Sequence, residues 1–183
     1  MLVCGGRKGN DHVTSLRRAW HQLLSSWYTR AHWWATLYAR WGLAPVGGAV
    51  VPWVAPRVPF HHGRIALVTA AGVHPRSATP FDMDNPRGDA SFREIPGDVA
   101  ASQLMITHDY YDHAAADRDV NTVFPLERLR ELAPLGVRVA PRHFGFMGHV
   151  LGAERERLTR ETAPEVARRL VADGATHAVF TPG

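Results

Sequence analysis

The sequence predicts an α/β fold in which helices flank a mostly parallel sheet, and three observations support this. A short, nearly continuous apolar run at residues 64–72 ends in glycine, which is typical of a strand buried on both faces. Further apolar runs follow, the first after a long irregular stretch at residues 73–102 and the later ones separated by helical patterns. The expected strands are 64–72, 103–107, 136–140 and 176–180, and the expected helices are 126–132 and 162–172. Because strand and helix alternate, the sheet is expected to be mostly parallel.

The last expected helix carries start and stop signals. Residues 162–165 read Thr-Ala-Pro-Glu, a capping box with proline in the first turn, so we expect the helix to begin there. Gly174 stands where a helix C-terminus favours glycine.

Three regions differ in composition. Residues 1–42 hold an N-terminal amphipathic helix appendage at 15–41, whose tryptophans and leucines recur at helical spacing. Residues 43–62 are a linker rich in proline and glycine, and residues 63–183 form the α/β domain, incomplete at its C-terminus. The appendage is expected to pack on the domain or on a partner subunit; a helix lying on a membrane surface is the alternative.

Composition narrows the classes of function. The net charge is +4, yet the arginines are spread among acidic residues, and a basic patch with interleaved aromatic residues occurs only at 17–41, so no nucleic-acid partner is expected. The single cysteine, Cys4, allows no disulfide within the chain, and residues 1–15 lack the apolar core of a signal peptide. We therefore expect a cytoplasmic protein without a transmembrane segment.

Polar loops follow three of the expected strands. His74 comes after the first, His108 after the second, and residues 181–183 after the last. In parallel, Rossmann-like sheets, ligands bind at the carboxyl ends of the strands. Topology alone therefore predicts that these loops converge on one functional edge.

A series of sequence blocks carries a more specific signal. The first is Ile65-Ala-Leu-Val-Thr-Ala-Ala-Gly-Val-His74, and another is Ala90-Ser-Phe-Arg-Glu-Ile-Pro-Gly-Asp98. The others are His108 with 111–112, 119–121 with 124–125, 140–141, 145–148, 161–167 and 173–181. In this order they resemble the selenoprotein B family of glycine, sarcosine, betaine and D-proline reductases, most closely its D-proline-reducing branch, over residues 52–183. Residues 109–110, 114–116 and 142–143 depart from that branch, so the substrate stays open.

The resemblance implies reductive cleavage of a C–N bond in an amino-acid-like or betaine-like substrate, with a selenol or thiol as nucleophile and electron donor. In that family the last strand leads into a selenocysteine or cysteine, which would fall immediately after Gly183. Selenocysteine is encoded by UGA, so we expect the chain to end at a UGA codon read as a stop, and this fragment alone to be inactive. The expected partners are a subunit bearing a pyruvoyl group, which holds the substrate, and a redox donor protein. No cofactor is expected in this chain itself.

The resemblance and the loop positions together nominate site residues. His108 is expected to transfer protons, oriented by Asp112, because histidine titrates near neutrality. Arg93 is expected to hold a carboxylate by a bidentate contact. The full set of expected substrate-binding residues is His74, Arg93, Tyr111, Asp119 and Asn121.

Structural alternatives exist for each of these residues. Asp112, Asp119 and Asn121 are common turn residues that bond their own backbone. Arg93 and Glu94 alternatively form a surface ion pair of little energetic value. His108 is alternatively a satisfied loop histidine.

Two rival functions are compatible with the same residues. His108, Asp112 and His113 match three positions of the H-x-H-x-D-H signature of metallo-β-lactamase-like hydrolases, but Tyr110 stands at the fourth and is a poor zinc ligand. We therefore predict no metal site. The other rival is a non-catalytic interaction domain whose tryptophan-rich helix docks a partner.

Overall fold

The computed structural model describes residues 55–182. The appended helix and most of the linker therefore lie outside the described residues. The chain divides into two compact units, one of residues 1–50 with 109–112 and the other of residues 51–108 with 113–183.

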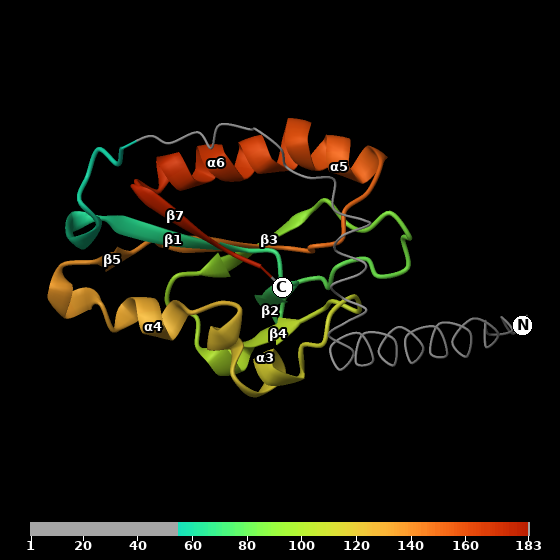
Figure 1. The fold of residues 1–183 in the computed structure, drawn as a ribbon, viewed down its shortest axis with the longest axis horizontal. Helices are drawn as coiled ribbons and strands as arrows, with labels where there is room; N and C mark the ends of the chain where they lie inside the picture. Colours follow the sequence, from blue (N-terminus) through green and yellow to red (C-terminus); the bar gives the residue numbers. More distant parts are fainter. Residues whose placement is uncertain (1–54, 183) are drawn as a thin grey trace, which may run out of the picture. The chain divides into compact units, whose positions relative to one another are not determined.

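A five-stranded sheet forms the centre of the second unit (Figure 1). Strand β1 (Arg64–Thr69) pairs in parallel along its whole length with β7 (His177–Thr181). On its other edge β1 pairs in parallel first with β5 (Arg138–Val139) and then with β6 (Arg142–Phe146). Strand β3 (Phe92–Pro96) pairs antiparallel with β6. The predicted α/β class and the parallel pairings are confirmed, although the sheet is mixed because β3 runs the other way.

A second, two-stranded sheet packs beside the first without joining it. It pairs β2 (Val73–Pro75) antiparallel with β4 (Leu104–Ile106). The strand expected at 103–107 therefore exists, but its expected place in the parallel sheet is wrong. Gly72 explains the difference, because its positive φ of 72° turns the chain out of β1 and into the separate ribbon.

Helices cover both faces of the large sheet (Figure 1). On one side lie α5 (Ala153–Arg157), the π-helical turn η5 (Leu158–Thr162) and α6 (Ala163–Ala172). On the other lie α3 (Ala114–Arg118) and α4 (Leu126–Arg130). The remaining short 3₁₀ turns are η1 (Phe60–His62), η2 (Ala101–Gln103), η3 (Val120–Thr122) and η4 (Ala133–Leu135). Within residues 55–182, no helix combines the length and the apolar character that crossing a membrane requires.

The predicted start of the last helix is wrong, whereas its end is confirmed. Thr162 has helical backbone angles and makes no side-chain cap, so the helix continues from Ala153 through the wide η5 turn. Pro164 has no N–H to donate, and a π-type turn just before it absorbs the missing bond. At the other end Gly174 has a φ of 69°, and the N–H of Ala175 donates to the carbonyl of Leu170, which closes the helix in a Schellman-type turn.

The core explains why the first strand has no polar face. Ala66 and Val68 pack with Phe144, Val166 and Leu170 between the sheet and α6. The alternate residues Ile65 and Leu67 are also buried, as are Phe124, Leu126 and Leu129 in and just before α4. A strand covered on both faces loses the alternation of polar and apolar residues, as the run at 64–72 predicts.

Candidate functional site

The carboxyl ends of the parallel strands β1, β6 and β7 meet at one edge of the sheet. Just beyond β1, the N–H of Ala70 donates to the carbonyl of Thr181 (3.0 Å) and that of Gly72 to the carbonyl of Phe146 (2.9 Å). A pocket of about 540 Å³ opens there. Its lining residues are Val68, Thr69, Ala70, Phe146, Met147, Gly148, Val150, Leu158, Ala163, Phe180, Thr181 and Pro182. We call it the carboxyl-edge pocket.

The walls of the carboxyl-edge pocket are mainly apolar. The hydroxyls of Thr69 and Thr181 both donate to the carbonyl of Val123, at 3.1 and 2.6 Å, so neither donor is available to a ligand. Phe180, by contrast, is 74% exposed. The pocket is therefore suited to the carbon skeleton of a ligand.

His108 reaches the same edge through the β2–β4 ribbon. The N–H of Thr107 donates to the carbonyl of Gly72 at 3.0 Å. A Cβ on Gly72 would lie 2.4 Å from the oxygen of Thr107, so only glycine allows this approach. A Cβ on Gly148 would lie 3.3 Å from Nε2 of His108, which places the imidazole against a pocket-lining residue. His108 and the end of β7 therefore converge, as the topology predicts.

Burial determines the charge of His108. The side chain is 6% exposed. Desolvation by burial, reinforced by the nearby His113 and His149, lowers the pKa of His108 to about 4. At neutral pH the ring is therefore neutral, with one nitrogen that donates and one that accepts.

Two predicted site residues, one expected to orient His108 and one expected to bind substrate, belong to the other compact unit. Asp112 and Tyr111 lie in the irregular segment 109–112, which groups with residues 1–50. Asp112 is exposed and Tyr111 half-buried. The orienting role of Asp112 and the binding role of Tyr111 stay predictions.

His74 lies in the ribbon, fully buried, with both ring nitrogens bonded. Nδ1 donates to the carbonyl of Pro75 and Nε2 accepts from the hydroxyl of Thr107, each at 2.8 Å. Burial is the main cause that lowers the pKa of His74. These bonds hold β2 to the residue before His108, so His74 supports the site without lining the carboxyl-edge pocket.

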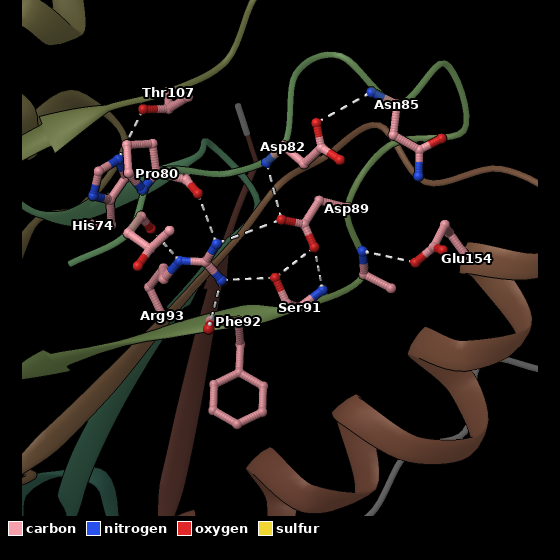
Figure 2. A network of polar contacts seen from close by, with 12 residues as sticks. His74, Pro80, Asp82, Asn85, Asp89, Ser91, Phe92, Arg93, Thr107 and Glu154 are labelled. Atoms are coloured by element: carbon pink, nitrogen blue, oxygen red, sulfur yellow. Dashed lines mark hydrogen bonds and ion pairs between the residues drawn. The ribbon is translucent and has the colours of Figure 1, made fainter. Parts of the chain in front are cut away.

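Hydrogen bonds to neighbouring residues hold the side chain of Arg93 in place (Figure 2). Its guanidinium has five N–H groups, and each has an acceptor. It also lies 4.4 Å from the ring centroid of Phe81. The acceptors are the carbonyls of Thr79 (2.5 Å), Pro80 (2.9 Å) and Phe92 (3.0 Å), the hydroxyl of Ser91 (2.7 Å) and the carboxylate of Asp89 (3.5 Å). No donor is left for a substrate carboxylate. The hydrogen bonds of Arg93 instead link the 76–91 loop to β3.

The expected pair of Arg93 with Glu94 also does not form. Glu94 instead forms ion pairs with Arg142 of β6 and Arg169 of α6. Arg142 in turn makes a two-pronged contact with Asp173, at 2.8 and 2.7 Å. These charges join the sheet to α6, away from the carboxyl-edge pocket.

Asp119 and Asn121 organise the chain before α4. The carboxylate of Asp119 accepts from the backbone N–H and the amide of Asn121 (3.0 and 2.8 Å), which lowers the pKa of Asp119. The Asn121 amide also donates to Glu127 at 2.8 Å and its oxygen accepts from the Glu127 N–H. The turn-making alternative therefore describes both residues, and Asp119 additionally lines a second pocket.

Sequence reasoning missed the residues that shape the edge. The apolar lining residues carry no chemical signature, and only the glycines at 145 and 148 indicate in the sequence that backbone can approach closely there. His143, in the core beneath the edge, was also missed: Nδ1 accepts from the N–H of Leu67 at 2.9 Å, and burial lowers its pKa to about 4. Over residues 55–182, no three His, Cys, Asp or Glu side chains are grouped to hold a metal ion.

Comparison with known proteins supplies one relative. No family model matches the chain, and no solved structure matches it. Subunit gamma of D-proline reductase from Acetoanaerobium sticklandii is 40% identical over 121 residues, which cover 65% of this chain and 48% of that subunit. The match thus spans about half the length of the relative.

Proposed function

We propose that the chain is a subunit of a selenol- or thiol-dependent amino-acid reductase, because it is a relative of D-proline reductase subunit gamma. This relative belongs to the family that the sequence motifs predict. The reaction is the reductive cleavage of a C–N bond in an amino-acid or betaine-like substrate. The observation that carries the proposal is the identity of 40% with that subunit.

The course of β7 supports a location for the reacting atom. β7 ends at Thr181, whose carbonyl is bonded to Ala70, and Pro182 already lines the carboxyl-edge pocket. The Cα of a residue that follows Gly183 would lie at most about 7 Å from that of Pro182, since consecutive Cα atoms are about 3.8 Å apart. We place the redox selenocysteine or cysteine there.

The chemistry requires two electrons and two protons. The C–N bond breaks, and a new C–H and a new N–H bond form. In the proposal the selenol or thiol supplies the electrons, a redox donor protein restores it, and a pyruvoyl group on a partner subunit holds the substrate amine.

The described residues contribute the surroundings of the reaction. The largely apolar walls give the carbon skeleton of a substrate a surface to pack against. His108, with its pKa lowered to about 4, stays uncharged at neutral pH, so it can relay a proton only by releasing its ring N–H proton as the other ring nitrogen takes one up.

The test is an assay of the protein purified with its natural partners. The gene is tagged in its own organism, and the complex is incubated with a dithiol reductant and, separately, D-proline, glycine, sarcosine or betaine. We expect one substrate to yield the amine-bearing product of C–N cleavage. Alkylation of the reduced complex with iodoacetamide should abolish turnover. A complex that turns over none of the four, while retaining its redox residue, would contradict the proposal.

A further inference from the structure

One side of the helical segment made of α5, η5 and α6 faces the sheet (Figure 1). Every fourth residue along it is buried or half-buried, and the residues between are mostly exposed. The residues on the sheet-facing side are Glu154, Leu158, Thr162, Val166 and Leu170. In a regular α-helix each step of four residues overshoots a full circle by about 40°, so the steps from the first to the last would add up to about 160°. Glu154 and Leu170 would then face nearly opposite directions.

The π-turn η5 removes most of this drift. The N–H of Ala163 donates to the carbonyl of Leu158, five residues back, so the turn holds one residue more than an α-turn. The chain before it is thereby set back by up to about 100°, the rotation of one residue. Without the π-turn, Leu158 would point along the flank that carries Glu165 and Arg169, where Arg169 pairs with Glu94 of β3. With it, Leu158 stays on the side that faces the sheet.

Leu158 thereby becomes part of the helical wall of the carboxyl-edge pocket. The other residue of this wall is Ala163, whose side chain is a single methyl group. On the sheet side of the pocket, Val68 belongs to the buried core cluster and Phe146 packs against it, so a change in the size of either would disturb the fold. Leu158 is half-buried and lies outside that cluster. Its side chain can therefore set the size of the pocket without disturbing the core.

We propose that Leu158 determines specificity in the carboxyl-edge pocket. The π-turn brings its side chain into the pocket at the ends of β6 and β7, where it limits the size of the carbon skeleton that the pocket accepts. The specificity role rests on the proposed function, because it concerns the substrate of that reaction. The placement of Leu158 by the π-turn does not depend on the reaction.

Thiol labelling tests the placement without any turnover. Leu158→Cys and Thr159→Cys are made in the full-length protein, and the rate of alkylation by iodoacetamide is read by mass spectrometry on the peptide that contains the new thiol. Thr159 is exposed, whereas Leu158 is half-buried. Leu158→Cys should therefore react about tenfold more slowly, since access limits the reaction. A regular helix would turn residue 159 toward the sheet in place of 158, so the reverse order of rates, or equal rates, would overturn the placement.

Substrate size tests the specificity role in the purified native complex. For each substrate that the wild type reduces, kcat/KM is compared with that of an analogue one methylene larger, such as D-pipecolate beside D-proline or N-ethylglycine beside sarcosine. One methylene in an apolar pocket changes kcat/KM about tenfold or more, so Leu158→Ala should raise the ratio of analogue to substrate by about that factor. Leu158→Phe should lower the ratio. Leu151→Ala is the matched control, because this leucine is 51% exposed and lies outside the pocket lining.

The outcomes separate the specificity role from the proposed function. A wild-type complex that turns over its substrate, with the same ratio in Leu158→Ala and Leu158→Phe, would overturn the specificity role and leave the proposed function intact. An equal shift in Leu151→Ala would also overturn it, because the effect would then not come from the pocket. A wild-type complex without any turnover would contradict the proposed function and the specificity role together, while the labelling rates would still decide the placement of Leu158.

Discussion

The loop region around Arg93 and the carboxyl edge around His108 both attracted attention in the sequence, and they are built in opposite ways. Around Arg93, charged side chains bond to nearby carbonyls and to Asp89, and every donor is used. At the carboxyl edge, glycines and apolar side chains leave space, and the polar groups of Thr69 and Thr181 are turned away to Val123.

The difference distinguishes side chains that stabilise the fold from a pocket that can bind a ligand. A cluster rich in charge can be entirely internal, since a loop with few apolar residues needs fixed bonds to hold its course. A ligand-binding site can carry little charge, because a reaction between a substrate and an incoming redox residue requires available volume and few water molecules. The predictions below test whether the two regions behave as differently as their contacts indicate.

The largest expected effect is the loss of stability in acid. His108 at the edge and His143 beneath it have pKa values lowered to about 4, whereas the unfolded value is 6.5. The unfolded state therefore binds more protons between these values, so stability is full above pH 6.5 and falls as the pH decreases toward 4. Each histidine contributes roughly 1.4 kcal/mol per pH unit in that window. Urea unfolding from pH 7 to pH 4 measures the slope, and histidine NMR should show both rings neutral at pH 5. Rings that titrate near 6.5 would refute this.

Gly72→Ala should destabilise the fold by roughly 3 kcal/mol or more, because it combines a left-handed backbone with a direct clash. The new Cβ would lie 2.4 Å from the carbonyl oxygen of Thr107. Gly174→Ala is the control: its φ of 69° is similar, but its nearest neighbour is the end of Arg64 at 3.4 Å. It should cost about 1–2 kcal/mol. Equal losses in chemical denaturation would show that close approach to the ribbon is unimportant.

Arg93→Gln should cost about 2–3 kcal/mol, since three carbonyls, Ser91 and Asp89 lose a partner in a half-buried setting. Arg128→Gln, in an exposed pair with Glu131, should change stability by less than about 0.5 kcal/mol. If Arg93→Gln instead left stability intact and impaired only substrate binding, the predicted substrate-binding role of Arg93 would be correct and the fastening role wrong.

The smallest expected change in stability comes from filling the carboxyl-edge pocket. Ala163→Leu places a larger side chain in the lining and keeps a good helix former, so stability should shift by less than about 0.5 kcal/mol. Reductase turnover should fall about tenfold or more, by analogy with other obstructions of a binding site. Ala167→Leu, one helical turn further on α6 and outside the pocket lining, is the control. Unchanged turnover in both variants would separate the pocket from the reaction.

The sequence predicted the elements marked by apolar runs and missed those stabilised by charge. Strands β1 and β7 and helix α4 stood out through apolar residues. Strand β6 reads Arg-His-Phe-Gly-Phe, and its Arg142 and His143 are satisfied by Asp173 and by the backbone of Leu67. Strand β3 likewise carries Arg93, held by residues of the preceding loop, and Glu94, whose partners Arg142 and Arg169 lie far along the chain. Such pairings leave no periodic pattern.

The candidate site was predictable only through topology. The position of His108 after an apolar run predicted that it lies at the carboxyl edge of the sheet. It does lie there, although the strand before it belongs to the separate β2–β4 ribbon. The acceptors that occupy Arg93 are mainly backbone carbonyls, which every residue possesses, so the sequence alone could not distinguish a fastened arginine from one awaiting a ligand.

The central claim is that a redox residue follows β7 at the carboxyl-edge pocket. The most direct measurement is to sequence the transcript from codon 183 onward and to identify, by mass spectrometry of the alkylated native protein, the residue after Gly183. The account predicts UGA decoded as selenocysteine, or a cysteine codon, in an open frame. An ordinary stop followed by untranslated sequence, or an open frame without a redox residue at that position, would contradict it.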